Sequence, residues 1–158
     1  MIRLIERRFD VPAPVADAWK FLARVEEWPR WAAHIARVEM SPPGEAGPQS
    51  SGCIHLRNGI RSTFRMTEFN FGKNWKWVGA FLWLRLHYDH RFEAVDARTS
   101  RLTWIIDAEG FGAAVLGRIF ARIYSRNLDK AIPALVAAMG VLHGAQPGAN
   151  PVERGRPA

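Results

Sequence analysis

Near the N-terminus the chain reads Phe9-Asp10-Val11-Pro12-Ala13-Pro14-Val15-Ala16-Asp17-Ala18-Trp19, and a second tryptophan-rich element follows as Trp28-Pro29-Arg30-Trp31. Residues 2–11 have strand character, and Pro12 and Pro14 end this strand because proline has no N–H to donate to a sheet. Pro14 also suits the start of a helix. The spacing of apolar residues then predicts a short helix to about Ala23, and a second short helix from Trp28-Pro29 to about His34.

Further strands are predicted where apolar and polar residues alternate. After a loop rich in proline and glycine (residues 42–52), glycine- and asparagine-containing turns separate most of these segments and favour hairpins. With residues 2–11 they give about seven strands in an antiparallel meander. The six further segments are Ile35–Met40, Gly52–Asn58, Ser62–Asn70, Trp75–Gly79, Trp83–Val95 and Arg101–Glu109.

A long amphipathic helix is predicted after Gly112, and its apolar stripe must pack against the sheet. Pro133 lies inside this helix and predicts a kink or a broken turn. We expect one domain over residues 1–142 and a disordered, Pro- and Gly-rich tail over residues 143–158. The apolar stripe comprises Leu116, Ile119, Phe120, Ile123, Leu128, Ile132, Leu135, Val136 and Met139. The opposite, solvated face carries Arg118, Arg122, Arg126 and Lys130.

The composition is that of an ordinary globular domain, with 48% hydrophobic and 23% charged residues in 158. These values exclude a fibrous or wholly disordered chain. Seven Trp and nine Phe are many for a chain of this size. Large flat rings suit the wall of a pocket for an apolar or aromatic ligand, although any single ring is more often part of a core.

The net charge is +7, and the arginines that supply most of it are scattered along the chain. This distribution argues against nucleic-acid binding. One cysteine, Cys53, excludes an intramolecular disulfide, and no His/Cys spacing indicates a zinc site. We therefore expect no metal and no cofactor. Neither a signal segment nor an apolar run of about 18 residues is present, so we expect a cytoplasmic protein without stable membrane insertion.

Several of these motifs, in this order, resemble those of the START-like, or Bet v 1-like (SRPBCC), superfamily. Within it, the chain is similar to the bacterial polyketide cyclase/dehydrase and lipid-transport group. The resemblance covers about residues 1–141. Its motifs are Val11-Pro12-Ala13-Pro14 with Trp19, Trp28-Pro29-Arg30-Trp31, Met66-Thr67-Glu68, His90-Arg91-Phe92 and Thr103-Trp104.

The resemblance implies an α+β helix-grip fold, in which a curved antiparallel sheet wraps around the C-terminal helix and encloses a cavity. Strand alternation then predicts which side chains face the cavity. The inward set is Phe64, Met66, Trp75, Trp77, Leu86, Tyr88, His90, Phe92, Leu102 and Trp104. The outward set is Arg65, Lys76, Arg85, His87, Asp89, Arg91 and Thr103. The helix contributes Ile119, Phe120, Ile123 and Tyr124, and the mouth is expected near Trp28, Trp31, Phe81 and Phe111.

The predicted ligand-binding residues come from these sets. They are Trp28, Trp31, Phe64, Met66, Trp75, Trp77, Phe81, Tyr88, His90, Trp104, Phe111, Phe120, Ile123 and Tyr124. Catalytic candidates are the polar groups expected inside, Glu68, Tyr88 and His90, which could act as acid and base on a poly-ketone. Hydrogen-bonded structural roles are the commoner alternative for His90 and Glu68.

Three functions remain open at this point. The first is a carrier or sensor that holds a hydrophobic small molecule, such as a lipid, a quinone or a polyketide. The second is an aromatase/cyclase-like enzyme. The third is an interaction module that docks an acidic protein or RNA through its arginine-rich surface, with the cavity filled by its own rings. Fold alone does not choose among them.

Overall fold

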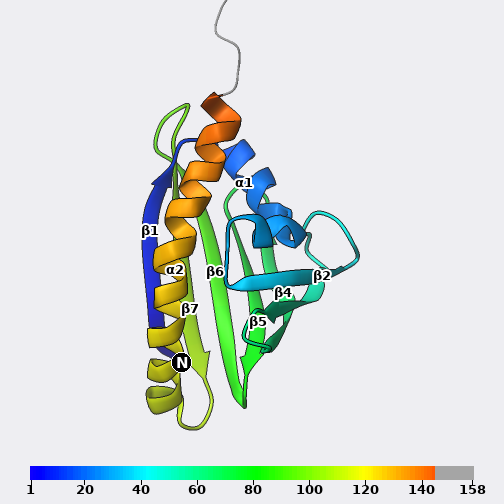
Figure 1. Cartoon of the computed structure of the whole chain (residues 1–158), viewed down its shortest axis with the longest axis vertical. Helices are drawn as coiled ribbons and strands as arrows, with labels where there is room; N and C mark the ends of the chain where they lie inside the picture. The colour runs from blue at the N-terminus through cyan, green and yellow to red at the C-terminus, as the bar shows by residue number, and fades with distance from the viewer. Residues whose placement is uncertain (145–158) are drawn as a thin grey trace, which may run out of the picture.

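The structure, a computed structural model, describes residues 1–144, and the predicted order of elements is confirmed (Figure 1). The helices are α1 (Val15–Ala23), the 3₁₀ helix η1 (Val25–Arg30) and α2 (Ala113–Gly144). The strands are β1 (Ile2–Val11), β2 (Ile35–Ser41), β3 (Ser51–Leu56), β4 (Arg61–Asn70), β5 (Asn74–Phe81), β6 (Leu84–Ala94) and β7 (Ser100–Glu109). Residues 143 and 144 are helical, so the tail predicted from 143 starts too early, and its remainder lies outside the described residues.

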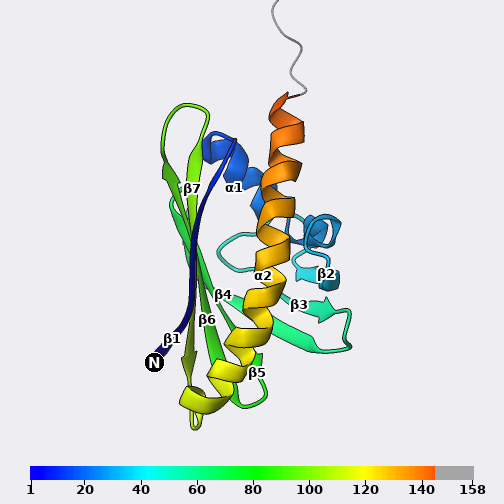
Figure 2. The ribbon, with the colours of Figure 1, turned by 60° about the vertical axis from the view of Figure 1, so that its left-hand side comes forward.

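All seven strands form one antiparallel sheet in the order β1-β7-β6-β5-β4-β3-β2. Strands β2 to β7 are a continuous meander, and β1 pairs with β7 at the far edge. The chain passes from one edge to the other through α1 and η1. The sheet curves, and α2 lies across its concave side (Figure 2). This arrangement is the predicted helix-grip architecture.

The helix α2 is uninterrupted through Pro133, so of the two alternatives predicted there, a kink or a broken turn, the broken turn is wrong. The proline removes one helical hydrogen bond, but the residues around it are anchored because Leu128, Ala131 and Leu135 are buried against the sheet. The predicted apolar stripe is only partly correct. Ile119 and Ile123 belong to that stripe and are about half exposed.

The second short helix lies earlier than predicted, at Val25–Arg30 instead of residues 28–34. Residues three apart lie directly above one another in a 3₁₀ helix. Val25 and Trp28 have this spacing and both are buried, so the tight helix lets one side of a very short segment pack inward. Pro29 therefore lies within the helix and not at its start.

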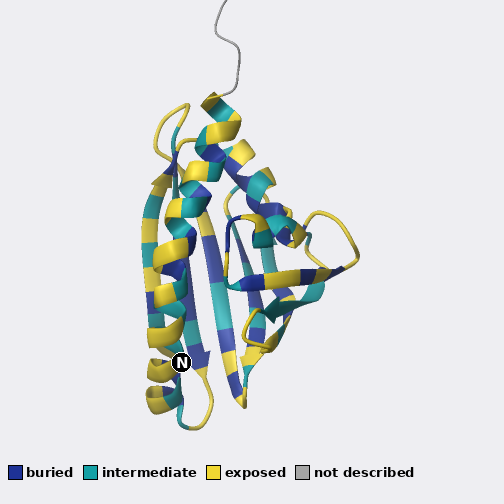
Figure 3. Ribbon diagram, viewed as in Figure 1, coloured by how far each residue is buried: buried dark blue, intermediate teal, exposed yellow. Residues whose placement is uncertain are grey.

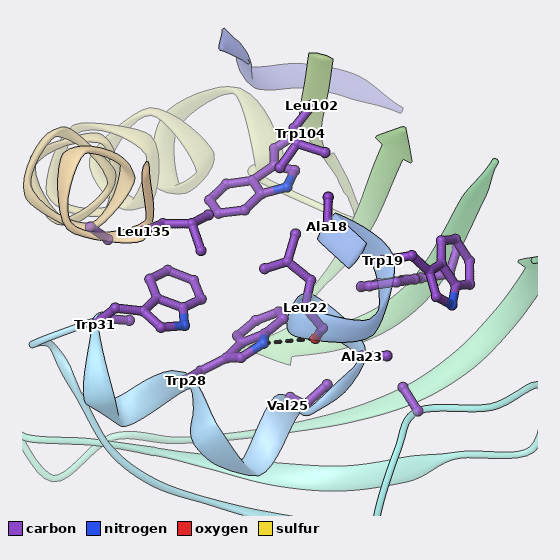
Figure 4. Close-up of a cluster of buried hydrophobic side chains, with 14 of the residues drawn as sticks. Ala18, Trp19, Leu22, Ala23, Val25, Trp28, Trp31, Leu102, Trp104 and Leu135 are labelled. Carbon is purple, nitrogen blue, oxygen red and sulfur yellow. Dashed lines mark hydrogen bonds between the residues drawn. The ribbon is translucent and has the colours of Figure 1, made fainter. Parts of the chain in front are cut away.

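One end of the core is filled by aromatic rings around Trp19. The ring centroids of Phe69, Trp75 and Phe92 lie 5.3, 4.7 and 4.9 Å from that of Trp19. Figure 4 shows Trp19 together with the buried residues of α1 and η1. These four rings pack on one another, and none of them lines the cavity described below.

A β-bulge in β4 reverses one predicted orientation. Met66 pairs with Trp77, but Glu68 pairs with Lys76 and Phe69 with Trp75, because Thr67 is an extra residue in the ladder. The Glu68 carboxylate consequently lies on the outer face, where it binds the Lys76 ammonium at 2.7 Å. The prediction that Glu68 faces the cavity is wrong.

Buried and exposed residues alternate along several strands (Figure 3). Two outward-facing residues, Asp89 and Thr103, are nevertheless buried, contrary to the expectation that they face water. Thr103 lies between Arg8 and Arg91 in the register of the sheet, and Arg91 also binds Asp89 at 2.8 Å. Long arginine side chains cover neighbouring short ones on an open sheet face, which accounts for the burial.

Candidate functional site

A cavity of about 150 Å³ lies between the concave face of the sheet, η1 and the middle of α2. Because about 10–15 Å³ of such space holds one water molecule, this cavity has room for a compact organic molecule. Its lining is overwhelmingly apolar. Of the predicted ligand-binding residues, those that line it are Trp28, Trp31, Phe64, Trp77, Phe81, Tyr88, His90, Trp104, Phe120, Ile123 and Tyr124.

Four predicted site residues do not line this cavity. Met66 and Trp75 are buried in the core, where Trp75 packs against Trp19. Phe111 lies in the loop before α2 and is 91% exposed. It is not part of the cavity mouth, where it was predicted to lie. Glu68 is turned outward by the bulge in β4. The sheet pattern placed the first two on the correct face, but alternation does not reveal how far along a strand the core ends and the cavity begins.

A row of rings forms the sheet side of the cavity. Register pairs Trp77 with Tyr88 across β5 and β6, and His90 with Trp104 across β6 and β7. The His90 ring centroid lies 4.7 Å from that of Trp77 and 5.7 Å from that of Trp104. Phe64 extends the row, with its centroid 4.8 Å from that of Trp77. A planar molecule inserted here has aromatic faces to stack on.

Trp28 in η1 and Trp31, which directly follows η1, cover the row. Both are buried, so they belong to the wall and not to the mouth as predicted. The Trp28 ring centroid lies 5.5 Å from that of Trp77, and Trp31 lies 6.3 Å from Trp104. The Trp28 indole N–H donates a hydrogen bond of 2.9 Å to the Leu22 carbonyl at the end of α1 (Figure 4). This bond fixes the indole plane and leaves its apolar edge for the cavity.

The α2 side of the cavity is built from two stacked rings. Phe120 and Tyr124 are one helical turn apart, and their centroids are 5.2 Å apart at an interplanar angle of 16°. Phe81, at the end of β5, approaches Phe120 at 5.2 Å. The mouth lies where lining residues reach the surface. These residues include Asn58 and Ile60 in the β3–β4 turn and Ile123 on α2.

The ionisable groups of the lining are held uncharged. Burial lowers the pKa of His90 from 6.5 to about 3, so its imidazole is neutral at physiological pH. Burial raises the pKa of Tyr124 to about 12. The pKa of Tyr88 is raised well above 10 by burial and, to a smaller extent, by Tyr124. Burial also lowers the pKa of His34, whose ring meets that of Tyr124 edge to face at 5.9 Å.

No Asp, Glu, Lys or Arg lines the cavity within residues 1–144. Apart from the indole N–H groups of the tryptophans, the polar lining groups come from His34, Asn58, Ser62, Tyr88, His90, Tyr124 and Asn127. An ion placed there would lose its hydration without gaining a counter-ion, which costs several kcal/mol. The described residues also contain no group of His, Cys, Asp or Glu side chains able to hold a metal.

Sequence reasoning missed part of the lining. The missed lining residues include Ile54 and Leu56 in β3, Ile60 in the β3–β4 turn, Ser62 in β4 and Asn127 in α2. The alternation of Ile54 and Leu56 was the available signal in β3. Asn127 lies three residues after Tyr124, on the same side of the helix, which is a signal that a helical wheel centred on Tyr124 reveals.

The family model for polyketide cyclase / dehydrase and lipid transport matches residues 3–139. This chain belongs to that family. The match runs from β1 almost to the end of α2 and so includes every wall of the cavity. It also confirms the superfamily that the sequence motifs indicated. No curated protein matches the chain.

Solved structures of the same fold come from proteins of several kinds. The Zhui aromatase/cyclase from Streptomyces sp. R1128 is 18% identical, with a TM-score of 0.67 over 92% of this chain and 98% of that one. A START superfamily protein from Mycobacterium smegmatis is 10% identical, with a TM-score of 0.62 over 87% and 99%. Ara h 8.0201 is 14% identical, with a TM-score of 0.61 over 89% and 97%. At these identities the likeness establishes the fold.

Proposed function

We propose that this protein binds an uncharged, compact hydrophobic molecule with a planar ring system, as a carrier or sensor. The observation that supports this function best is the cavity itself, which is walled by stacked aromatic rings and has no charged lining side chain within residues 1–144. Quinones and neutral polyketide-type rings fit this description. A lipid with a charged head group fits only if that group stays outside, at the mouth.

Packing and one hydrogen bond hold the aromatic walls of the cavity in position. Trp28 is fixed by its hydrogen bond to Leu22, and the rings of Phe64, Trp77 and His90 contact one another in sequence along the sheet. Apolar burial supplies the affinity, at about 25 cal/mol for each Å² of apolar surface removed from water. The few polar groups, among them the hydroxyls of Tyr88 and Tyr124, orient the ligand.

The first test is native mass spectrometry of the purified protein, with organic extraction and identification of any molecule released. Binding is then titrated with a matched pair of probes, 2-acetylnaphthalene and 2-naphthoate, which share a ring and differ in charge. We expect the ketone to bind and the carboxylate to bind roughly a hundredfold more weakly or not at all, because its desolvation is uncompensated. Equal affinity for both would contradict an uncharged ligand, and binding of neither would contradict the open cavity.

Two variants with the same substitution localise the binding. Ile54→Trp enlarges a side chain that lines the cavity and should abolish binding of 2-acetylnaphthalene. Ile2→Trp, on an exposed position of β1, should bind as the wild type does. If both variants bind equally well, the probe occupies another place.

A cyclase-like enzyme is a second candidate, supported by the two neutral phenols and the imidazole that line one cavity. Hydroxyls of Tyr88 and Tyr124 can donate to a ketone oxygen, although an imidazole with a pKa of about 3 is a weak base at neutral pH. The variants Tyr88→Phe and Tyr124→Phe separate the candidates. A carrier loses at most about tenfold in affinity for each lost hydrogen bond, whereas an enzyme that relies on these groups loses turnover of a poly-ketone substrate at nearly unchanged affinity.

A further inference from the structure

The β5–β6 turn and the loop before α2 lie at the same end of the molecule (Figure 1), and exposed apolar residues occur in both loops there. Leu82, Trp83 and Phe111 are exposed by 66%, 62% and 91%. The Trp83 indole donates a hydrogen bond of 3.0 Å to the Phe111 carbonyl, so the two loops are in contact. We call Leu82, Trp83 and Phe111 the apolar tip.

Burial in the core does not account for the tip residues, because the side chains of all three are mainly exposed. Leu82 has a φ of 55°, in the left-handed region, where a residue with a side chain costs about 1 kcal/mol. Two-residue hairpin turns of this kind favour Asn and Gly, which are small and polar or flexible. Leu82 and Trp83 instead place large apolar side chains in water, and neither belongs to the buried core.

Exposed apolar residues also occur on the outer face of α2, next to the apolar tip. Val115, Ile119 and Ile123 occupy successive turns of the helix and are all more than half exposed. Arginines alternate with them on the same face, at positions 118, 122 and 126. No acidic residue occurs between Glu109 and Asp129, and none of the three arginines forms an ion pair within residues 1–144.

Exposed apolar side chains interleaved with unpaired arginines match the chemistry of an anionic bilayer, because apolar groups enter the boundary of the acyl chains while arginines meet the lipid phosphates. An acidic protein would satisfy the arginines but would offer less to the projecting Trp83 and Leu82. The surface is also continuous with the cavity. Ile123 belongs to both, and Phe81, which directly precedes Leu82, packs against Phe120 inside the cavity.

We propose that the apolar tip and the arginine-bearing face of α2 dock this protein reversibly on an anionic membrane surface, with the cavity mouth beside the lipid. The docking goes beyond ligand binding and can be measured without any ligand. In this geometry a hydrophobic molecule passes between bilayer and cavity along Ile123 with little exposure to water.

The test is co-sedimentation of the full chain with vesicles of phosphatidylcholine alone and of phosphatidylcholine mixed with phosphatidylglycerol. We expect binding to the mixed vesicles and little to the neutral ones. Trp83→Ser and Ile119→Ser should each lower the partition onto mixed vesicles roughly tenfold, and Arg122→Glu should do so by at least as much. All three positions are exposed, and circular dichroism of each variant verifies its fold.

Matched controls lie at the opposite end of the molecule. Val141→Ser removes an exposed apolar side chain near the end of α2, and Arg98→Glu reverses a charge in the β6–β7 turn. Both controls should bind vesicles nearly as the wild type does. The proposal is overturned if the wild type does not bind anionic vesicles. It is also overturned if Arg98→Glu weakens binding as much as Arg122→Glu while Trp83→Ser has no effect, because the protein then adsorbs through its net charge. It is equally overturned if ultracentrifugation shows a wild-type dimer that Trp83→Ser dissociates and that does not bind vesicles.

Discussion

The rings of His90 and Trp77 lie 4.7 Å apart, centroid to centroid, on adjacent strands of the cavity wall. Trp28, Trp75 and Trp104 also approach the imidazole, with centroids 5.5 to 6.0 Å away. Within residues 1–144, no charged side chain lines the cavity to stabilise a protonated imidazole. His90 therefore behaves as a polar wall residue, and its neutrality keeps the cavity suited to an uncharged ligand.

His90 should make the protein less stable in mild acid. Its pKa is about 3 in the folded chain, against 6.5 as the ordinary value, so the unfolded chain binds the extra proton between these pH values. Above pH 6.5 the imidazole is neutral in both states, and His90 does not lower the free energy of unfolding. As the pH falls from 6.5 toward 3, protonation of the unfolded chain lowers the free energy of unfolding, by about 2 kcal/mol at about pH 5.

The variant His90→Phe, which retains a flat ring, removes this linkage. Urea unfolding at pH 7 and pH 5 should show a smaller loss of stability for His90→Phe than for the wild type, by about 2 kcal/mol. Other groups titrate in the same range, so only the difference between the two proteins is informative. Identical losses would mean that His90 is solvated or has an acidic partner.

The outer and inner faces of β4 could be predicted only up to Met66. Alternation correctly places Phe64 and Met66 inward, and the same rule then predicts that Glu68 faces inward too. The bulge at Thr67 shifts the remaining residues by one, so Phe69 faces the core and Glu68 faces Lys76. A bulge depends on packing between strands that are distant in the sequence, and one extra residue in a run of alternating residues leaves no local signal.

Strict alternation predicts that Glu68 faces the cavity and that Phe69 faces solvent. Because the bulge reverses both orientations, a substitution at Phe69 should affect stability more than one at Glu68. Phe69→Ala removes a partly buried ring beside Trp19 and should cost about 2–3 kcal/mol in the free energy of unfolding. Glu68→Gln breaks an exposed ion pair with Lys76 and should cost less than about 1 kcal/mol. Denaturant unfolding measures both. Binding of 2-acetylnaphthalene should be unchanged in Glu68→Gln, and a large loss of binding there would restore Glu68 to the site.

The architecture could be predicted because the sequence patterns that determine it are local. Pro12 and Pro14 end a strand, and the apolar stripe of α2 requires a sheet to pack on. The cavity could be predicted less completely. Trp75 and Trp77 lie two residues apart on β5 and face the same side of the sheet. Trp75 nevertheless contacts Trp19, whereas Trp77 lines the cavity. The position of α1 decides which of them is core, and this is a tertiary contact that periodicity does not contain.

Gly52 makes room for Phe64. A Cβ at Gly52 would lie 2.7 Å from the Phe64 ring and in direct collision with the Glu39 carbonyl oxygen. Gly52→Ala should therefore lower the free energy of unfolding by about 1–3 kcal/mol and weaken binding of 2-acetylnaphthalene, because the Phe64 ring must move. Gly47→Ala is the matched control, since its Cβ would meet nothing closer than the Ser50 hydroxyl at 4.0 Å. Equal stability of the two variants, measured by thermal unfolding, would show that the ring adapts freely.

The two tyrosines report directly on the cavity, because the chain contains no others and both line it. Burial raises the pKa values of both tyrosines, that of Tyr124 to about 12. At about pH 10 half of the tyrosines of an unfolded chain are ionised, whereas the folded chain should show little phenolate absorbance. Since the unfolded chain releases these protons first, stability should fall as the pH rises from 10 toward 12. A spectrophotometric titration with circular dichroism as the check on folding measures this, and Tyr88→Phe isolates Tyr124 with a midpoint near pH 12. Half ionisation at about pH 10 in a folded protein would mean that water fills the cavity and solvates the phenols, which would also remove the basis for an uncharged ligand.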